Sequence, residues 1–363
     1  MKVGMMLPCV HSVALNVMTA QAVEQMGADS LWVPDHLLGF WHPEIWKDFP
    51  AAAAMPDPDA FLDPFCVATA VAGATSLPVG TCVTDASRRG GIDLVRGALT
   101  VNEVASGGFT LGVGSGERES TEPFGYDFTK PVGNLERTLG EIRSLLDTGD
   151  MPGDGVGRTG IDRAGPNGVP AVWVGAQGGR RSLRLAGEYG DGWLALLYQP
   201  ERFAELLSGV REFAQRAGRK PPVAGMFPLT FFGESRARII ETIEKNPLIK
   251  LLLLFADSDL WQRYGIEHPH GADAKGYHTI PHELDPTALR ELASTIPLEM
   301  FDEWVMLGNA HEIAARLEPF AKAGLEHVVL ADMSAIALAP EDAPAALGQL
   351  ATLAPLLKEM STP

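Results

Sequence analysis

Two short phrases of the chain place ionisable side chains directly after apolar runs. One is Trp-Val-Pro-Asp-His at residues 32–36, and the other is Leu-Gly-Val-Gly-Ser-Gly-Glu at residues 111–117. An apolar run that ends in Asp, His or Glu is typical of a buried strand with a polar side chain at its carboxyl end, where α/β barrels carry their chemistry. An imidazole with an ordinary pKa of about 6.5 exchanges a proton near neutral pH, as the interconversion of a carbonyl and an alcohol requires. We therefore expect the functional groups to include Asp35, His36 and Glu117.

Each of these residues also has a plain structural interpretation. A single His after a strand is most often a core or capping residue, and Glu117, which precedes Arg118, is also compatible with a helix cap or an ion pair. The functional interpretation gains weight because Asp35 directly precedes His36 and because a barrel places the ends of both strands on one rim.

A glycine-rich turn provides a second candidate site. Gly178-Gly179-Arg180-Arg181-Ser182 follows a predicted strand and opens a predicted helix. Glycines let the backbone approach a phosphate, the free amides at a helix start point at it, and Arg adds charge-assisted hydrogen bonds. The segment predicts a phosphate-binding turn, although a Gly-Gly turn before a helix is also common without a ligand.

Strand-like and helix-like patterns alternate along the chain and must position these groups. The pattern predicts strands at 2–7, 30–34, 78–84, 109–113, 171–176, 192–197, 223–232 (split by Pro228) and 326–331, and helices at 13–26, 91–105, 180–188, 201–217 and 341–358. Such alternation favours parallel pairing through right-handed crossovers, and eight units close a (β/α)8 TIM barrel. We predict one domain over residues 1–363, with insertions at about 37–64, 118–134 and 246–300 that build the pocket.

Composition excludes several classes of function. The chain has 363 residues with 29 Lys and Arg against 46 Asp and Glu, a formal net charge of −17, which disfavours nucleic acids and anionic membranes. The densest apolar patch, 248–256, is shorter than the roughly 20 residues of a membrane span, and the first residues lack the apolar stretch of a signal peptide. Three widely spaced cysteines fit a reducing compartment. We expect a soluble, cytoplasmic protein.

Longer phrases resemble the luciferase-like oxidoreductases, and within them the branch that depends on the deazaflavin coenzyme F420. They are Asp35-His36, Gly80-Thr81-Cys82-Val83-Thr84 and the segments 112–117, 174–179 and 186–192. More locally, Cys82-Val83-Thr84-Asp85, Gly116-Glu117-Arg118-Glu119 with Glu122-Pro123, and Glu267-His268-Pro269 with Gly271-Ala272-Asp273 resemble the phthiodiolone ketoreductases of mycobacteria. The order and approximate spacing of the phrases hold from residue 2 to about 340.

The resemblance implies hydride transfer between F420 and a ketone or secondary alcohol. His36 would exchange the proton with the substrate oxygen, Glu117 would lie near a pyrimidine nitrogen of the cofactor, and Asp35 would hydrogen-bond the cofactor. It also implies a cis peptide between Cys82 and Val83 against the cofactor ring, and a homodimer. The implied cofactor contacts are Asp35, Cys82, Val83, Thr84, Gly116, Ala176, Gly178, Gly179, Arg180 and Arg181.

Other assignments stay open beside this one. An FMN-dependent luciferase-like monooxygenase and a non-catalytic cofactor-binding barrel are the alternatives. Coenzyme F420 carries an acidic oligoglutamate tail, for which Arg88, Arg89 and Arg180 are candidate counter-charges, whereas Arg88 and Arg89 also fit a solvated surface turn.

The substrate pocket is predicted from aromatic residues and from two departures from the resemblance. Phe40, with Trp41 beside it, stands where the sugar-phosphate dehydrogenases of the family carry a Trp at the cofactor ring, and a plug of the barrel mouth is its plain interpretation. Asp302-Glu303 precedes Trp304 where those enzymes carry a basic residue for the sugar phosphate. The pocket is therefore expected to take an uncharged, fairly apolar ketone or alcohol, such as a lipid.

Four histidines, His268, His270, His278 and His282, fall within fifteen residues. Their irregular spacing, with Pro and Gly between them and no Cys nearby, does not fit a metal site, and none is predicted. A loop at the substrate entrance, with His268 in the pocket, is the preferred interpretation.

Overall fold

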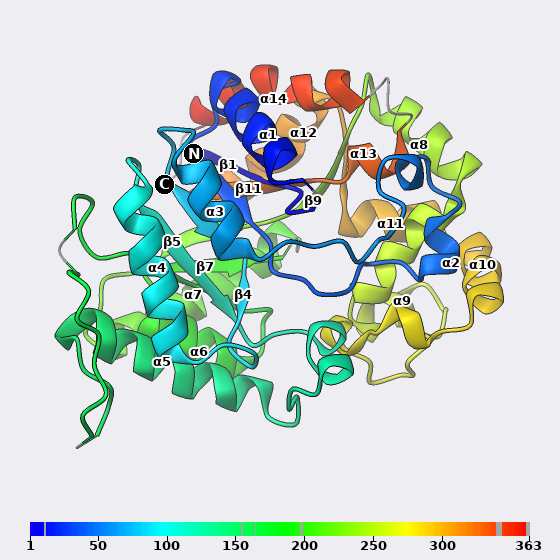
Figure 1. Cartoon of the computed structure of the whole chain (residues 1–363). Helices are drawn as coiled ribbons and strands as arrows, with labels where there is room; N and C mark the ends of the chain where they lie inside the picture. The colour runs from blue at the N-terminus through cyan, green and yellow to red at the C-terminus, as the bar shows by residue number, and fades with distance from the viewer. Residues whose placement is uncertain (11, 154, 164, 197–198, 339–342, 361–363) are drawn as a thin grey trace.

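Eight parallel strands close into a barrel in the computed structural model, which describes residues 1–363 except 11, 154, 164, 197–198, 339–342 and 361–363. Closure is made by pairing of the first strand with the last, in the register Lys2 opposite His327. The predicted (β/α)8 TIM barrel is confirmed (Figure 1). The barrel strands are β1 (Lys2–Met6), β2 (Ser30–Val33), β3 (Val79–Thr81), β5 (Phe109–Gly114), β6 (Ala171–Gly175), β7 (Gly192–Ala195), β8 (Val223–Met226) and β11 (His327–Asp332).

Helices surround the barrel. The longer ones are α1 (Val13–Gln25), α3 (Pro64–Ala72), α4 (Gly91–Val104), α5 (Pro131–Thr148), α6 (Arg180–Tyr189), α7 (Pro200–Arg216), α12 (Ala310–Lys322) and α14 (Ala343–Lys358). Side-chain caps set several starts: Ser12 caps α1, Asp63 caps α3, and Asn309 with Glu312 forms a capping box on α12. Sequence patterns did not predict α3, α5 and α12, and residues 341–342 of the predicted last helix lie outside the described residues.

Two predicted strands are divided in the structure. The strand predicted at 78–84 becomes β3 and β4 (Thr84–Asp85), and the strand predicted at 223–232 becomes β8 and β9 (Leu229–Phe232) on either side of Pro228. Both β8 and β9 pair with β11, and β9 also pairs with β10 (Met306–Gly308), a strand that the sequence pattern missed. The strand predicted at 192–197 ends at Ala195, and Leu197 lies outside the described residues.

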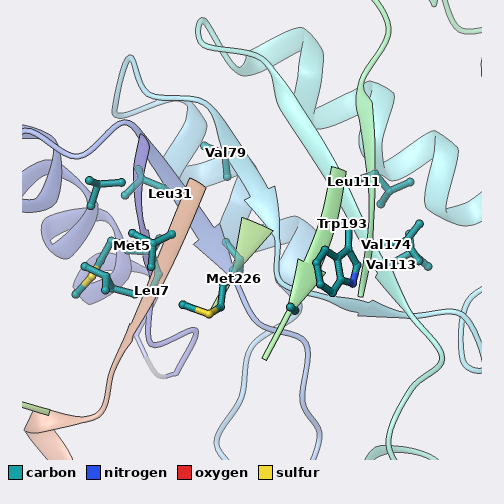
Figure 2. Close-up of a cluster of buried hydrophobic side chains, with 14 of the residues drawn as sticks. Met5, Leu7, Leu31, Val79, Leu111, Val113, Val174, Trp193 and Met226 are labelled. Carbon is teal, nitrogen blue, oxygen red and sulfur yellow. The ribbon is translucent and has the colours of Figure 1, made fainter. Parts of the chain in front are cut away.

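The barrel interior is filled by two tryptophans and a histidine that glycines on adjacent strands accommodate. Trp32 and Trp173 pack at 5.1 Å between ring centroids, and His327 lies edge-on to both. A Cβ at Gly80 would lie 2.8 Å from the Trp32 ring, and one at Gly192 would lie 2.3 Å from the Trp173 ring. On the outer side of the strands, aliphatic residues such as Leu31, Val113 and Met226 pack into the main buried cluster (Figure 2).

The three stretches predicted as insertions carry short helices. Residues 37–64 contain α2 (Pro43–Trp46) and η1 (Pro50–Ala53), and residues 118–134 contain η2 (Arg118–Ser120) and η3 (Glu122–Phe124). Residues 246–300 contain η4 (Pro247–Phe255), α9 (Ser258–Arg263), η5 (Gly276–His278), η6 (Pro281–Glu283), α10 (Pro286–Thr295) and the start of α11 (Leu298–Trp304). Two further short helices, α8 (Arg236–Lys245) and α13 (Ser334–Ala337), complete the elements.

The first and third insertions share a hydrophobic cluster of their own. The Trp41 indole N–H donates to the carbonyl of Leu248 at 3.2 Å, and α2 packs against α10. This joint cluster, separate from the main one, holds one wall of the barrel mouth in place. The single-domain organisation over 1–363 stays a prediction. Within the described residues, no helix has the length and apolarity needed to cross a bilayer.

Candidate active site

A cavity opens at the carboxyl ends of the barrel strands and contains about 1090 Å³ of empty space, part of it open to solvent. Segments that lie far apart in the sequence line it, as a barrel predicts. The lining residues are Met6, Asp35, His36, Phe40, Cys82, Val83, Thr84, Asp85, Gly114, Ser115, Gly116, Glu117, Glu119, Ser120, Gly175, Gln177, Leu196, Phe227, Leu229, Leu252, Phe255, Tyr277 and Trp304.

His36 and Glu117 meet in this cavity, as the strand ends predicted. His36 Nδ1 lies 3.6 Å from Oε2 of Glu117 and 3.2 Å from Oε1 of Glu119. Phe40 and Phe61 pack against the imidazole at 4.8 and 5.6 Å between ring centroids. Sequence reasoning missed Glu119 as a site residue; its signal was the Glu-x-Glu spacing after β5, which η2 turns back toward His36.

Both glutamates are protonated more readily than usual. Burial, together with the neighbouring Glu119 carboxylate, raises the pKa of Glu117 to about 8, and burial raises the pKa of Glu119 to about 7. Oε2 of each is buried without a hydrogen-bond partner among the described residues. At neutral pH this corner of the cavity therefore holds carboxyl groups that can both donate and accept a proton.

Asp35 lines the cavity and is held by an ion-pair network. Its Oδ2 accepts from Thr84 Oγ1 at 2.6 Å and its Oδ1 lies 2.9 Å from Arg88, which also contacts Asp85 at 3.0 Å. Arg88 is only 5% exposed, and Arg89 pairs with Asp63 at 2.8 Å. The structure thus pairs Asp35 with Arg88. Both Arg88 and Arg89 contact carboxylates, so neither is a surface residue without an ion-pair partner.

The peptide between Cys82 and Val83 is cis, which confirms the prediction. Val83 faces glycines on the neighbouring strands: a Cβ at Gly114 would lie 2.7 Å from its side chain, and one at Gly175 would lie 3.3 Å from it. Burial raises the pKa of the Cys82 thiol far above neutrality, so the thiol is not an activated nucleophile. Backbone and Val83 methyls together form a smooth part of the cavity wall.

The predicted phosphate turn follows β6, whose last residue Gly175 lines the cavity. Gly178 has a φ of +92°, and Gly179 caps α6 without any side-chain hydrogen bond to the helix amides. Arg181 is already paired with Glu136, and Arg180 has no ion pair with the residues that the structure describes. Ala176 is buried beneath the turn, where its carbonyl accepts from Trp193 at 3.0 Å.

Two residues predicted for the substrate pocket lie elsewhere. Trp41 belongs to the cluster shared by the insertions, and its ring packs on Trp46 and Phe49. His268 is 2% exposed and contacts the Leu254 carbonyl at 3.1 Å; burial lowers its pKa to about 4.

No metal site is predicted at the four histidines of residues 268–282. Among the described residues, the side chains whose donor atoms gather most closely are His36, Glu117 and Glu119, within 4.8 Å of one another.

The outer part of the cavity is apolar. Phe40, Leu252, Phe255 and Trp304 contribute to its wall, and its lining among the described residues includes neither Lys nor Arg. Asp302 and Glu303 do not line it: Asp302 contacts Arg236 at 2.9 Å, and Glu303 pairs with Arg263. These ion pairs neutralise Asp302 and Glu303 outside the cavity. The apolar wall, and not these two carboxylates, therefore determines which substrates the cavity accepts.

Comparison with known proteins agrees with this architecture. Residues 1–327 match the family model described as luciferase-like monooxygenase. The chain is 33% identical over 333 residues to the phthiodiolone/phenolphthiodiolone dimycocerosates ketoreductase of Mycobacterium tuberculosis, covering 87% of this chain and 86% of that protein.

Solved structures share the fold at low sequence identity. An F420-dependent secondary alcohol dehydrogenase in complex with an F420-acetone adduct aligns with a TM-score of 0.72 and 18% identity, over 98% of each chain. The FMN-bound oxygenating constituent of 3,6-diketocamphane monooxygenase from Pseudomonas putida aligns with a TM-score of 0.67 and 14% identity, over 100% of this chain and 99% of that chain.

Proposed function

This chain belongs to the luciferase-like monooxygenase family, and we propose that within it the protein is an F420-dependent oxidoreductase. The reaction is hydride transfer between the deazaflavin and a ketone or secondary alcohol. The observation that carries the proposal is the convergence of His36 and Glu117 beside an apolar wall at the barrel mouth. The ketoreductase relative at 33% identity supports the same reaction class.

The residues of the cavity fit a flat tricyclic ring. Gly114 and Gly175 give the Val83 methyls room, and all three residues line the cavity, so this wall offers apolar surface to a ring. The Glu117 carboxyl lines the cavity and supplies a polar contact at the edge of the ring, as a ring with amide-like nitrogens and oxygens needs. Gly178, Gly179 and the free amides at the start of α6, with Arg180, would hold the phosphate.

When bound, the deazaflavin supplies or accepts the hydride at the substrate carbon. His36 would then give a proton to the substrate oxygen during ketone reduction, or remove it during alcohol oxidation, because an imidazole can act as both general acid and general base. Glu117 would hold a proton at the ring edge. Phe40 and Phe61, packed on the imidazole, keep its orientation fixed.

The substrate class follows from the outer cavity wall. Leu252, Phe255 and Trp304 offer aliphatic and aromatic surface, and a sugar phosphate would find no Lys or Arg among the described lining residues to neutralise it. An uncharged, apolar ketone or secondary alcohol, including a lipid, is the substrate that this wall favours. A homodimer and a cytoplasmic location belong to the same proposal and come from the resemblance and the composition.

Titration of the apoprotein with F420 and, separately, with FMN tests the cofactor. We expect tight binding of F420, turnover of an apolar ketone under anaerobic conditions, and loss of turnover in His36→Asn. Binding of FMN alone, with oxygen required for turnover, would instead identify a monooxygenase. Binding of either cofactor without turnover of any ketone or alcohol would leave a cofactor-binding barrel.

A further inference from the structure

Glu119 is buried next to His36 yet has no part in the reaction described above. Its side chain is 1% exposed, and its Oε1 lies 3.2 Å from His36 Nδ1 and accepts from Ser120 Oγ at 3.0 Å. Its Oε2 is buried without a hydrogen-bond partner among the described residues. A buried carboxylate oxygen without a donor is costly, so the unpaired oxygen points to a proton or an ion at this place.

Glu117 has the same kind of unpaired oxygen beside the same imidazole nitrogen. Its side chain is 39% exposed, but its Oε2 is buried, lacks a partner among the described residues, and lies 3.6 Å from His36 Nδ1. The ligand atoms of the three side chains lie within 4.8 Å of one another. Two ionised carboxylates this close repel each other, and a single proton shared between them removes the repulsion and satisfies both oxygens.

We propose that Glu117 and Glu119 share one proton at neutral pH, and that this pair, through Glu119, holds Nδ1 of His36 protonated and leaves Nε2 to serve the substrate. Glu119 is then a positioning residue. The cluster has one net negative charge on the carboxyl pair and one positive charge on the imidazolium. His36 Nε2 makes no hydrogen bond with the described residues, in agreement with that role.

The role of the pair in turnover rests on the proposed function. As the hydride reaches the carbonyl carbon of the ketone, the proton on Nε2 passes to the carbonyl oxygen, and the N–H bond breaks as the O–H bond forms. His36 becomes neutral with Nδ1 still protonated and hydrogen-bonded to Glu119. Solvent returns one proton to Nε2 before the next turnover, so the protons balance. The carboxyl pair holds the tautomer fixed throughout.

Other charged groups near the cluster are already engaged. Asp85 is held by Arg88 at 3.0 Å, and Arg88 also contacts Asp35 at 2.9 Å. Arg118, between the two glutamates in sequence, turns outward to Glu122 at 2.6 Å and Glu283 at 3.3 Å. The phenol of Tyr277 lines the cavity, and burial raises its pKa, so it stays neutral. These groups are therefore paired or neutral, which leaves the carboxyl pair and His36 to interact with one another.

The test reads the imidazole directly, without cofactor or turnover. We would label the histidines with ¹⁵N, assign His36 by comparison with His36→Asn, and follow both ring nitrogens against pH. In the wild type, Nδ1 carries the proton of the neutral imidazole, because the Glu119 carboxylate accepts from it. In Glu119→Gln a neutral amide replaces that carboxylate, so we expect the ¹⁵N shifts to show the proton divided between Nδ1 and Nε2. The matched control Glu122→Gln removes an exposed carboxylate of the same loop and should leave both ¹⁵N shifts unchanged.

A second readout covers variants that fold poorly. Infrared difference spectra of the wild type against Glu117→Gln at pH 7 should show one protonated carboxyl, and Glu119→Asp should retain it. Unchanged ¹⁵N shifts of His36 in folded Glu119→Gln, or no protonated carboxyl in the wild type, overturns the proposal. Stoichiometric Zn²⁺ or Mn²⁺ in the purified protein, lost in Glu119→Gln, would overturn it in favour of a metal site. If the proton pair is found but F420 does not bind, the proposed function fails and the pair stands.

Discussion

Arg88 and Asp35 form a buried ion pair at 2.9 Å at the wall of the candidate active site, and the side chain of each is at most 5% exposed. Asp85 shares the same guanidinium at 3.0 Å. The network ties the end of β2, which carries His36, to the segment after β4. The position of the imidazole thus depends on a contact between parts of the chain that are about fifty residues apart in sequence.

Replacement of Arg88 should therefore strongly destabilise the folded protein. Arg88→Met removes the guanidinium that buried Asp85 contacts and leaves Asp35 with the longer contact to Arg89 at 3.5 Å, and we expect a loss of about 3–5 kcal/mol in the free energy of unfolding. Chemical denaturation at pH 7 measures it. The control is Arg96→Met, whose exposed guanidinium lies 3.9 Å from Asp93 and which should change stability by less than about 1 kcal/mol. Equal effects of the two substitutions would contradict the account of the network.

The fit of the barrel interior gives a second prediction. A Cβ at Gly192 would lie 2.3 Å from the ring of Trp173, so Gly192→Ala forces a strand or the buried indole to move, and we expect a loss of about 1–3 kcal/mol. A methyl group at Gly209, within α7, would meet nothing within 4 Å, and Gly209→Ala should stabilise the helix by about 0.5–1 kcal/mol. Thermal unfolding of both variants decides whether the tryptophans set the glycine positions.

Much of the architecture could be predicted from the sequence because a buried barrel strand appears as a short apolar run that ends at a polar residue. That pattern predicted β1, β2, β5 and the positions of His36 and Glu117 at one rim. The three-residue strand β10 was missed because it is too short for a periodic pattern.

Sequence patterns missed or misplaced some residues of the candidate site for physical reasons. Glu119 was missed because only the turn of η2 brings it back to the imidazole. Trp41 and His268 are residue types that often line pockets. Here the Trp41 indole N–H donates to the Leu248 carbonyl and the His268 ring packs on Trp261, so both are buried among the insertions and away from the cavity. Residue type alone does not tell which of two hydrophobic clusters an aromatic ring joins.

Stability should fall in mild acid because His327 is buried as the neutral base. Burial lowers its pKa to about 4, and its Nε2 lies 2.9 Å from Ser30 Oγ. Between about pH 6.5 and pH 4 the unfolded chain binds a proton that the folded chain refuses, so the free energy of unfolding decreases as the pH falls, by at most about 3 kcal/mol from this residue.

Comparison with a variant isolates the contribution of His327 to the pH dependence of stability. His268, whose pKa is also lowered to about 4, adds a loss of the same sign, whereas the raised pKa values of Glu117 and Glu119 act in the opposite direction, because they favour the folded state as the pH falls. The difference in unfolding free energy between wild type and His327→Asn, measured from pH 7 to pH 5, should narrow as the pH falls. A constant difference would show that His327 is not buried as the neutral base.

Removal of the imidazole should slow turnover and spare cofactor binding. His36→Asn cannot deliver or accept the proton at the substrate oxygen, and we expect kcat to fall by about 10²–10⁴-fold. The dissociation constant for F420, from fluorescence titration, should change little, because the proposed phosphate turn and ring surface are unaltered. Parallel loss of binding would instead place His36 among the cofactor contacts.

Substrate size should respond to the aromatic wall opposite His36. Phe255 lies on η4, packs edge-on to Phe40 at 5.2 Å and lines the cavity. Phe255→Ala removes apolar surface, so kcat/KM for a small ketone should fall, while a ketone bulky enough to fill the space should lose less or gain. One buried methylene corresponds to about 0.8 kcal/mol, or roughly fourfold in kcat/KM, so a homologous series of ketones resolves the change.

The control for that series is Phe124→Ala. Phe124 is 47% exposed in η3 and does not line the cavity, so its removal should leave the dependence of kcat/KM on chain length unaltered. The same slope in wild type and Phe255→Ala would contradict an apolar substrate site on this wall. Turnover of a sugar phosphate by the wild type would contradict it more directly, because binding that anion requires a cation that the described part of the lining does not supply.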